Sequence, residues 1–176
     1  LLSRSPEKEG EDFKYNACYL DIANEISRIV PAAKVDLIRF FELVLFNYLV
    51  ANGDAHLKNF SLMETVQGDY ILSPAYDLLC TALHIDDANL GLHGGLYDGD
   101  MAEKPYQNYG IYTYDSFRLF AGKIGIQEEI ATGTIDRFML NVLPAMNMID
   151  RSFLSPEAKV TYKEILGERH RRLMIR

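Results

Sequence analysis

The chain has 176 residues, of which 48% are hydrophobic and 24% charged, and its formal net charge at pH 7 is −7. These values predict one globular domain with a sizeable core and exclude a disordered or membrane-embedded protein. The acidic balance argues against a broad nucleic-acid-binding face, because such faces gather lysine and arginine. One basic cluster, residues 169–172, is explained about equally well by a solvated helix end and by a partner site.

The two cysteines, Cys18 and Cys80, have neither metal-ligand spacing nor the number needed for a disulfide framework. We therefore expect reduced, buried thiols in a cytoplasmic protein. The longest apolar run, residues 40–51, is too short to span a bilayer, so no membrane association is expected. Residues 1–16 are mostly polar and the first residue is not Met, which favours a linker-like edge of something larger.

Two helices are predicted in the first third of the chain. The first covers about residues 19–30 and is ended by Pro31. The second covers about residues 34–50 and is apolar at nearly every position, so neighbours should surround it on most sides. Asn52 and Gly53 should end this helix, with Gly53 free to take the left-handed cap conformation.

The spacing of apolar residues then changes from that of a helix to that of strands, which predicts a small hairpin. Phe60, Leu62 and residues 70–72 have the character of two short strands, with Gly68 in the turn and Pro74 after the second strand. Residues 84–110 contain five glycines and Pro105, which predicts an irregular loop with at most short strands.

Helices return in the last third. One is predicted over about residues 116–123, capped by Thr113 or Asp115 before it and by Gly125 after it. Another covers about residues 127–148, with Pro144 kinking or dividing it. The last covers about residues 156–173, with Ser155 as its N-cap. The predicted fold class is mainly α with a small β-hairpin.

The polar residues after the second helix have the spacing that phosphoryl transfer requires. Asp54 precedes Asn59 as D-x-x-x-x-N, and the hairpin then leads to Asp77. Transfer needs a carboxylate to take the acceptor's proton and oxygen ligands to hold Mg²⁺ against phosphates. The six-residue pattern alone is more often an ordinary helix-ending turn. The buried helix, the hairpin and the second Asp reverse that balance and indicate a base, Asp54, with two metal ligands.

The two segments that carry these residues resemble a known family. Residues 46–61 (FNYLVANGDAHLKNFS) and 72–78 (LSPAYDL) are similar to the catalytic and metal-binding segments of the HipA-like serine/threonine kinases, the toxin halves of bacterial toxin–antitoxin pairs. Residues 110–174 resemble the helical C-terminal region of that family more loosely. The resemblance implies a protein-kinase-like C-terminal lobe over residues 1–176 that phosphorylates a protein serine or threonine, with ATP and Mg²⁺ as cofactors.

The resemblance also implies a role for each site residue. Asp54 would be the catalytic base and Asn59 and Asp77 the magnesium ligands. The residues along the nucleotide would be His56, Leu57, Lys58, Asn59, Tyr76 and Asp77. His56 could instead tie the loop to the backbone, and Lys58 could be solvated.

Two departures from ordinary protein kinases agree with the HipA-like pattern. The metal-binding Asp is followed by Leu78 and Leu79 rather than Phe-Gly, and Gly53 stands where an Arg would precede the base. A glycine-rich loop and a strand Lys have no place ahead of Asp54. We therefore expect the N-lobe to be absent and the chain alone to have negligible kinase activity.

The expected partners follow from that interpretation. They are a protein substrate, the missing N-lobe in cis or in trans, and an antitoxin or DNA-bound repressor, with no direct nucleic-acid contact. Two alternatives stay open. One is a small-molecule kinase of the aminoglycoside phosphotransferase type, which uses a similar Gly-Asp-x-x-x-x-Asn loop, although residues 74–77 favour the HipA-like pattern. The other is a non-catalytic module that binds an antitoxin or repressor without turning over ATP.

Overall fold

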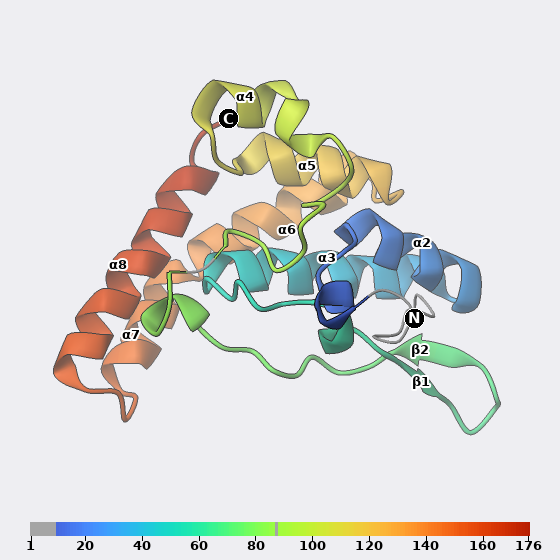
Figure 1. Cartoon of the computed structure of the whole chain (residues 1–176), viewed down its shortest axis with the longest axis horizontal. Helices are drawn as coiled ribbons and strands as arrows, with labels where there is room; N and C mark the ends of the chain where they lie inside the picture. The colour runs from blue at the N-terminus through green and yellow to red at the C-terminus, as the bar shows by residue number, and fades with distance from the viewer. Residues whose placement is uncertain (1–9, 87) are drawn as a thin grey trace.

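A computed structural model describes residues 10–86 and 88–176, apart from the side chain of Glu11. The described chain is mostly helical, with one two-stranded antiparallel sheet, as the sequence predicted. In Figure 1 the helix α3 (Ala33–Leu49) crosses the middle of the molecule, with α8 (Pro156–Leu173) along one edge and the hairpin at the opposite corner.

The helices α2 (Tyr19–Ile29) and α3 pack against each other. The helix α2 buries Tyr19, Ile22, Ala23 and Ile26, whose spacing of three and four residues places them on one face. The helix α3 contacts α2, α6, α8 and the second strand, so it is surrounded on several sides as expected. It therefore supplies a rigid support for the loop that leaves its C-terminal end.

The hairpin consists of β1 (Leu62–Glu64) and β2 (Tyr70–Leu72), with Met63 opposite Ile71. Gly68 in the turn has φ 83°, which favours glycine. The buried carboxylate of Asp36 on α3 accepts a hydrogen bond from the backbone N–H of Leu72 at 2.8 Å. This contact ties the hairpin to the central helix and sets where the chain emerges toward Asp77.

The region 84–110 contains more helix than predicted. It holds a 3-10 turn at Asp100–Ala102 and the short helix α4 (Lys104–Tyr109). The prediction of at most short strands is wrong because Pro105 does not interrupt helix here: it lies in the first turn of α4, where proline is tolerated. Gly110 ends α4 in the left-handed conformation.

The C-terminal half is a set of packed helices: α5 (Tyr114–Lys123), α6 (Glu128–Leu140), α7 (Val142–Asp150) and α8. Thr113 is the N-cap of α5, and Ser155 caps α8 by accepting from the backbone N–H of Ala158. The predicted helix 127–148 is divided at Asn141 rather than at Pro144, which lies in the first turn of α7. None of the described helices is long and apolar enough to cross a membrane.

Candidate active site

The loop after α3 is braced by buried polar side chains. Asn52, 4% exposed, donates from Nδ2 to Asn47 Oδ1 at 2.9 Å and to the backbone oxygen of Asp77 at 3.0 Å. The residue in the left-handed conformation is Ala51 (φ 56°), not Gly53, so the predicted glycine cap is wrong. Gly53 instead donates its backbone N–H to Thr81 Oγ1 at 2.9 Å.

Asp54 lies half-buried at the edge of a groove of about 400 Å³ whose walls include Tyr15, Leu90 and His93. Its Oδ1 accepts a hydrogen bond from the Tyr15 hydroxyl at 2.7 Å. The Lys14 ammonium lies 3.8 Å from the same oxygen. The side chain is 44% exposed, so the carboxylate can reach a molecule in the groove.

Asn59 and Asp77 are brought together from opposite ends of the hairpin. Asn59 Nδ2 donates to Asp77 Oδ2 at 2.6 Å, and Asn59 Oδ1 accepts from the backbone N–H of His56 at 3.0 Å. Asp77 has φ 56°, an uncommon conformation for a non-glycine residue, and its backbone oxygen is held by Asn52. The two predicted metal ligands therefore adjoin each other beside the loop that carries Asp54.

His56 lies under the loop and is 8% exposed. Burial lowers the pKa of its imidazole and the nearby Lys14 ammonium lowers it further, which favours the neutral ring. Its Nδ1 atom is buried without a hydrogen-bond partner among the described residues. The neighbouring Ala55 oxygen accepts from Tyr19, and a Cβ at Gly91 would stand 2.5 Å from the Ala55 nitrogen, so this approach requires glycine.

The other predicted nucleotide-facing residues lie on the outer side of the loop. Lys58 is exposed, and its Nζ lies 5.0 Å from the centroid of the Phe13 ring. The Tyr76 hydroxyl donates to the Lys58 backbone oxygen at 2.6 Å. Leu57 is half-buried. Tyr76 therefore links the segment before Asp77 to the segment before Asn59.

Comparison with known proteins places this arrangement in a family. Residues 2–146 match the HipA-like C-terminal domain. The chain belongs to that family. Two curated relatives from Sinorhizobium fredii carry the names "Putative kinase Y4dM", 40% identical over 57 residues, and "Putative kinase Y4mE", 34% identical over 68 residues.

These matches are partial. The first covers 32% of this chain and 14% of the relative, and the second covers 39% and 16%. The fold is similar to a chain of the Shewanella oneidensis MR-1 toxin–antitoxin complex of HipA, HipB and operator DNA, with a TM-score of 0.70 and 16% identity. That match covers 95% of this chain and 38% of the solved one.

The donor set of this HipA-like domain fits a magnesium ion shared with phosphates. Asp77 offers a carboxylate and Asn59 an amide oxygen, which also accepts from the backbone N–H of His56; both are hard ligands of the kind Mg²⁺ prefers. The described residues contain no group of three or more His, Cys, Asp or Glu that could hold a metal by themselves. A site with two protein ligands needs other oxygens, and nucleotide phosphates and water supply them in such sites.

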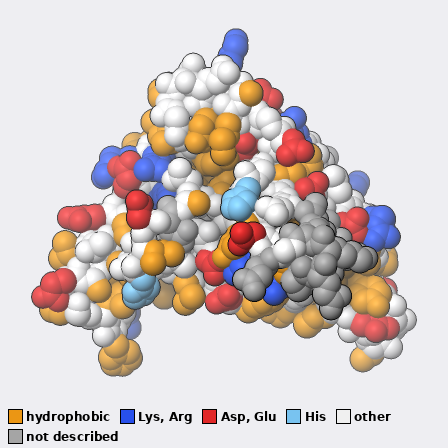
Figure 2. Space-filling view, in the orientation of Figure 1, with side chains coloured by type: hydrophobic (Ala, Val, Ile, Leu, Met, Phe, Trp, Pro, Cys, Tyr) orange, Lys and Arg blue, Asp and Glu red, His pale blue; other side chains and the backbone are white. Residues whose placement is uncertain are grey.

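In the basic cluster at residues 169–172 of this HipA-like domain, Arg169 is internal, whereas Arg171 is exposed and pairs with Glu168. Arg169 is 7% exposed, donates to Asn89, and lies 4.8 Å from the centroid of the Tyr48 ring. Arg172 donates to Asn89 and to Glu168. On the face shown in Figure 2, Lys and Arg side chains are interspersed with Asp and Glu. The cluster thus serves packing more than a basic surface.

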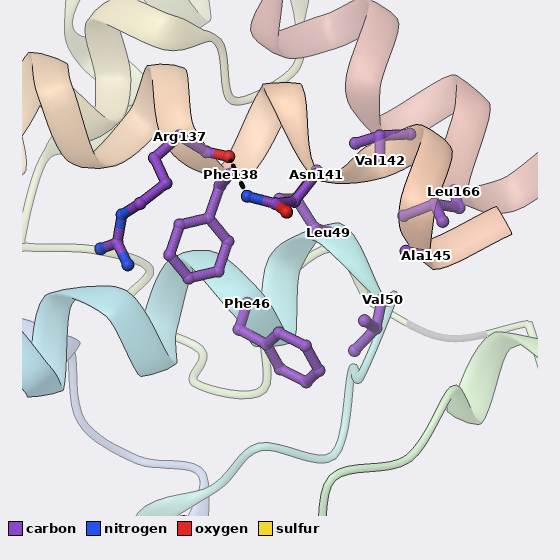
Figure 3. A pocket seen from close by; sticks show the side chains of 9 residues that line it. All are labelled: Phe46, Leu49, Val50, Arg137, Phe138, Asn141, Val142, Ala145 and Leu166. Atoms are coloured by element: carbon purple, nitrogen blue, oxygen red, sulfur yellow. Dashed lines mark hydrogen bonds between the residues drawn. The ribbon is translucent and has the colours of Figure 1, made fainter. Parts of the chain in front are cut away.

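A second hollow, of about 250 Å³, lies on another side of α3 (Figure 3). Phe46 and Phe138 line it from α3 and α6, and Val142 and Leu166 line it from α7 and α8. Its wall contains no carboxylate and none of the predicted site residues. This hollow therefore lacks the residues that phosphoryl transfer would require.

Proposed function

We propose that this chain is the catalytic and metal-binding lobe of an ATP- and Mg²⁺-dependent serine/threonine protein kinase of the HipA-like type. The observation that carries the proposal is the contact of Asn59 with Asp77 at 2.6 Å, beside a loop whose Asp54 opens into a groove. Family membership and the kinase names of the two relatives support it.

The chemistry of this chain's own residues would divide between two sides of the loop. Asp54 accepts the hydrogen bond of the acceptor hydroxyl and takes its proton as the oxygen attacks phosphorus. Asp77 and Asn59 would hold the metal through their oxygens, and bound magnesium would neutralise charge on the phosphates. Lys58 and Tyr76 lie on the side of the metal ligands and would line the nucleotide.

We further propose that transfer needs an ATP-binding N-lobe, in cis or in trans, because the chain has no glycine-rich loop or strand Lys before Asp54. We call the chain together with the N-lobe that completes it, in cis or in trans, the joined kinase. The isolated chain should show negligible transfer from ATP. Substantial Asp54-dependent transfer by the isolated chain would contradict this requirement.

The test is radiolabelled phosphate transfer from ATP by the joined kinase, with mass spectrometry to identify the modified side chain. We expect Mg²⁺-dependent phosphorylation of a protein serine or threonine that is lost in Asp54→Ala. Transfer that is unchanged in this variant would refute the proposal. Labelling of a small molecule instead would favour the aminoglycoside-type alternative.

We propose a DNA-binding antitoxin as partner and the cytoplasm as the location. The fold-similar chain was solved in a complex of HipA, HipB and operator DNA. Because this chain is acidic and the charged side chains on the face in Figure 2 are interspersed, DNA contact would pass through the partner. Co-purification with a repressor expressed from the same operon would support the proposal, and direct operator binding by this chain alone would contradict it.

A further inference from the structure

The short segment before α2 is packed onto the candidate active site. Residues Glu11–Lys14 form a 3-10 turn, and Phe13 in it is 8% exposed. The backbone oxygens of Tyr15 and Ala17 accept hydrogen bonds from His93 and Gly94 at 3.0 Å each. Within the stretch expected to be a linker-like edge, Phe13 is therefore buried and Lys14 and Tyr15 are half-buried, while residues 1–9 lie outside the described chain.

This anchoring directs two side chains at the proposed base. The Tyr15 hydroxyl donates to Asp54 Oδ1 at 2.7 Å, and Lys14 Nζ lies 3.8 Å from that same oxygen. The Tyr15 ring is itself held, stacked on His93 with centroids 5.6 Å apart and edge-on to His56 at 5.5 Å. Three elements far apart in sequence thus fix one phenol hydroxyl against one carboxylate oxygen.

The second oxygen of Asp54 is left for another partner. Among the described residues, every hydrogen bond and ion pair made by this carboxylate goes to Oδ1, including the longer approach of His56 Nε2 at 4.0 Å. A carboxylate free to rotate presents either oxygen in varying directions. One held at Oδ1 presents Oδ2 in a single direction, which is the positioning that a general base requires.

We propose that Lys14 and Tyr15 form a clamp on Asp54 that orients the base for the acceptor hydroxyl; this inference rests on the proposed kinase function. During transfer the acceptor O–H bond breaks and its proton goes to Oδ2 of Asp54. The acceptor oxygen bonds to the γ-phosphorus of ATP while the bond from that phosphorus to the bridging oxygen breaks, releasing ADP. Tyr15 keeps its proton throughout, so it is a positioning residue.

The first test is Tyr15→Phe in the joined kinase, which keeps the ring contacts and removes only the hydroxyl. We expect kcat to fall about tenfold or more, because small displacements of a catalytic group are costly, while the KM for ATP is unchanged. Tyr109→Phe on α4, half exposed and remote from the loop, is the matched control and should keep the full kcat. Lys14→Met should also lower kcat, and Lys14→Arg should restore most of it.

A double-mutant cycle separates positioning from a general structural effect. In an Asp54→Ala background, Tyr15→Phe should cause no further loss of the residual rate, because the group it orients is gone. Equal losses in both backgrounds would overturn the clamp. If Asp54→Ala abolishes transfer while Tyr15→Phe matches wild type, the clamp fails and the kinase function stands. If Asp54→Ala has no effect, the proposed function fails first.

A readout without nucleotide uses this chain alone, labelled with ¹³C at the aspartate carboxyl carbons. The Asp54 resonance, assigned by its loss in Asp54→Ala, should shift in Tyr15→Phe and stay unchanged in Tyr109→Phe. The thermal midpoint of each variant shows whether the fold is intact. An Asp54 resonance that does not move in folded Tyr15→Phe would overturn the proposed contact.

Discussion

The loop region and the helical C-terminal half of this molecule are held together by different interactions. Around Asp54 the chain runs through short, irregular segments, and the buried Asn52 and Asn59 and the half-buried Thr81 connect them by hydrogen bonds. From α5 onward the interior is mostly apolar, with Phe117 and Phe120 fully buried, and charged pairs such as Lys163 with Asp150 lie on the surface.

This difference predicts how each region responds to mutation. Exposed polar groups of the loop region should affect chemistry with little effect on stability, because they do not hold the core. Apolar side chains of the helical half should affect stability alone, because burial of apolar surface is what they contribute. Buried braces such as Asn52 should affect both properties.

The largest effect is expected at the proposed base. Asp54→Ala should lower kcat of the joined kinase by about 10²–10⁴-fold, the usual contribution of a general base. Its thermal midpoint should stay near wild type, because the side chain is 44% exposed. Steady-state transfer and thermal unfolding measure the two properties, with the exposed Asp98→Ala as control. A large loss of stability in Asp54→Ala would contradict the prediction that exposed polar groups of the loop region affect chemistry and not stability.

The largest effect on stability is expected at Phe117, whose ring is fully buried against Tyr48 and Tyr112. Phe117→Ala should lower the free energy of unfolding by about 3–5 kcal/mol. Urea unfolding of this chain measures it. Phe153→Ala removes the same ring from a fully exposed position and should leave stability unchanged. Similar losses in both variants would refute apolar packing as the cause.

Asn52 is a buried hydrogen-bonding side chain of the loop region, so its replacement should affect both stability and the chemistry of the site. Asn52→Ala removes both the hydrogen bond to Asn47 and the one to the Asp77 backbone, so stability should fall by about 1–3 kcal/mol. Because Asp77 loses its brace, Mg²⁺-dependent ATP binding by the joined kinase should weaken as well. Asn147→Ala on the exposed side of α7 is the control. A loss of stability with unchanged ATP binding would show that the hydrogen bond from Asn52 to the Asp77 backbone does not contribute to Mg²⁺-dependent nucleotide binding.

The smallest effect is a pH dependence at Asp100, a buried carboxylate that accepts from the Tyr112 hydroxyl and from the Leu96 backbone. Burial raises its pKa above the ordinary value of 3.8. Its contribution to stability is therefore present below that value and lost as pH rises through the folded pKa.

The measurement is urea unfolding from pH 4 to pH 7. Wild-type stability should fall relative to Asp100→Asn as the pH rises, because Asn carries no charge to desolvate. Asp98→Asn, at an exposed position, should show no such trend. A constant difference between wild type and Asp100→Asn would contradict the raised pKa.

Much of the fold and of the site could be predicted because its signals are local. The spacing of Asp54 and Asn59, the apolar run at residues 70–72, and the caps at Thr113 and Ser155 all lie within a few residues. The structure confirms the hairpin and most helices, and it brings Asn59 and Asp77 into contact. The chemical roles of these residues stay predictions.

What sequence reasoning missed depends on contacts between distant segments. Tyr15 is 39 residues from Asp54 and lies in a polar stretch that was taken as a linker. Thr81 lies outside the segments that carry the resemblance, the sequence indicates Asn52 only as a helix end, and the roles of both follow from which backbone groups lie nearby in space. Ala51, rather than Gly53, takes the left-handed conformation because the buried Asn52 brace fixes the backbone there. Local patterns do not encode such pairings.

The central claim is that Asp77 belongs to the metal side of the site and Asp54 to the acceptor side. Calorimetric titration of the joined kinase with ATP, with and without Mg²⁺, tests it most directly in Asp77→Ala and Asp54→Ala. We predict that Asp77→Ala loses the Mg²⁺-dependent gain in affinity while Asp54→Ala keeps it. Unchanged Mg²⁺-dependent binding in Asp77→Ala would contradict the account and favour a non-catalytic interaction module.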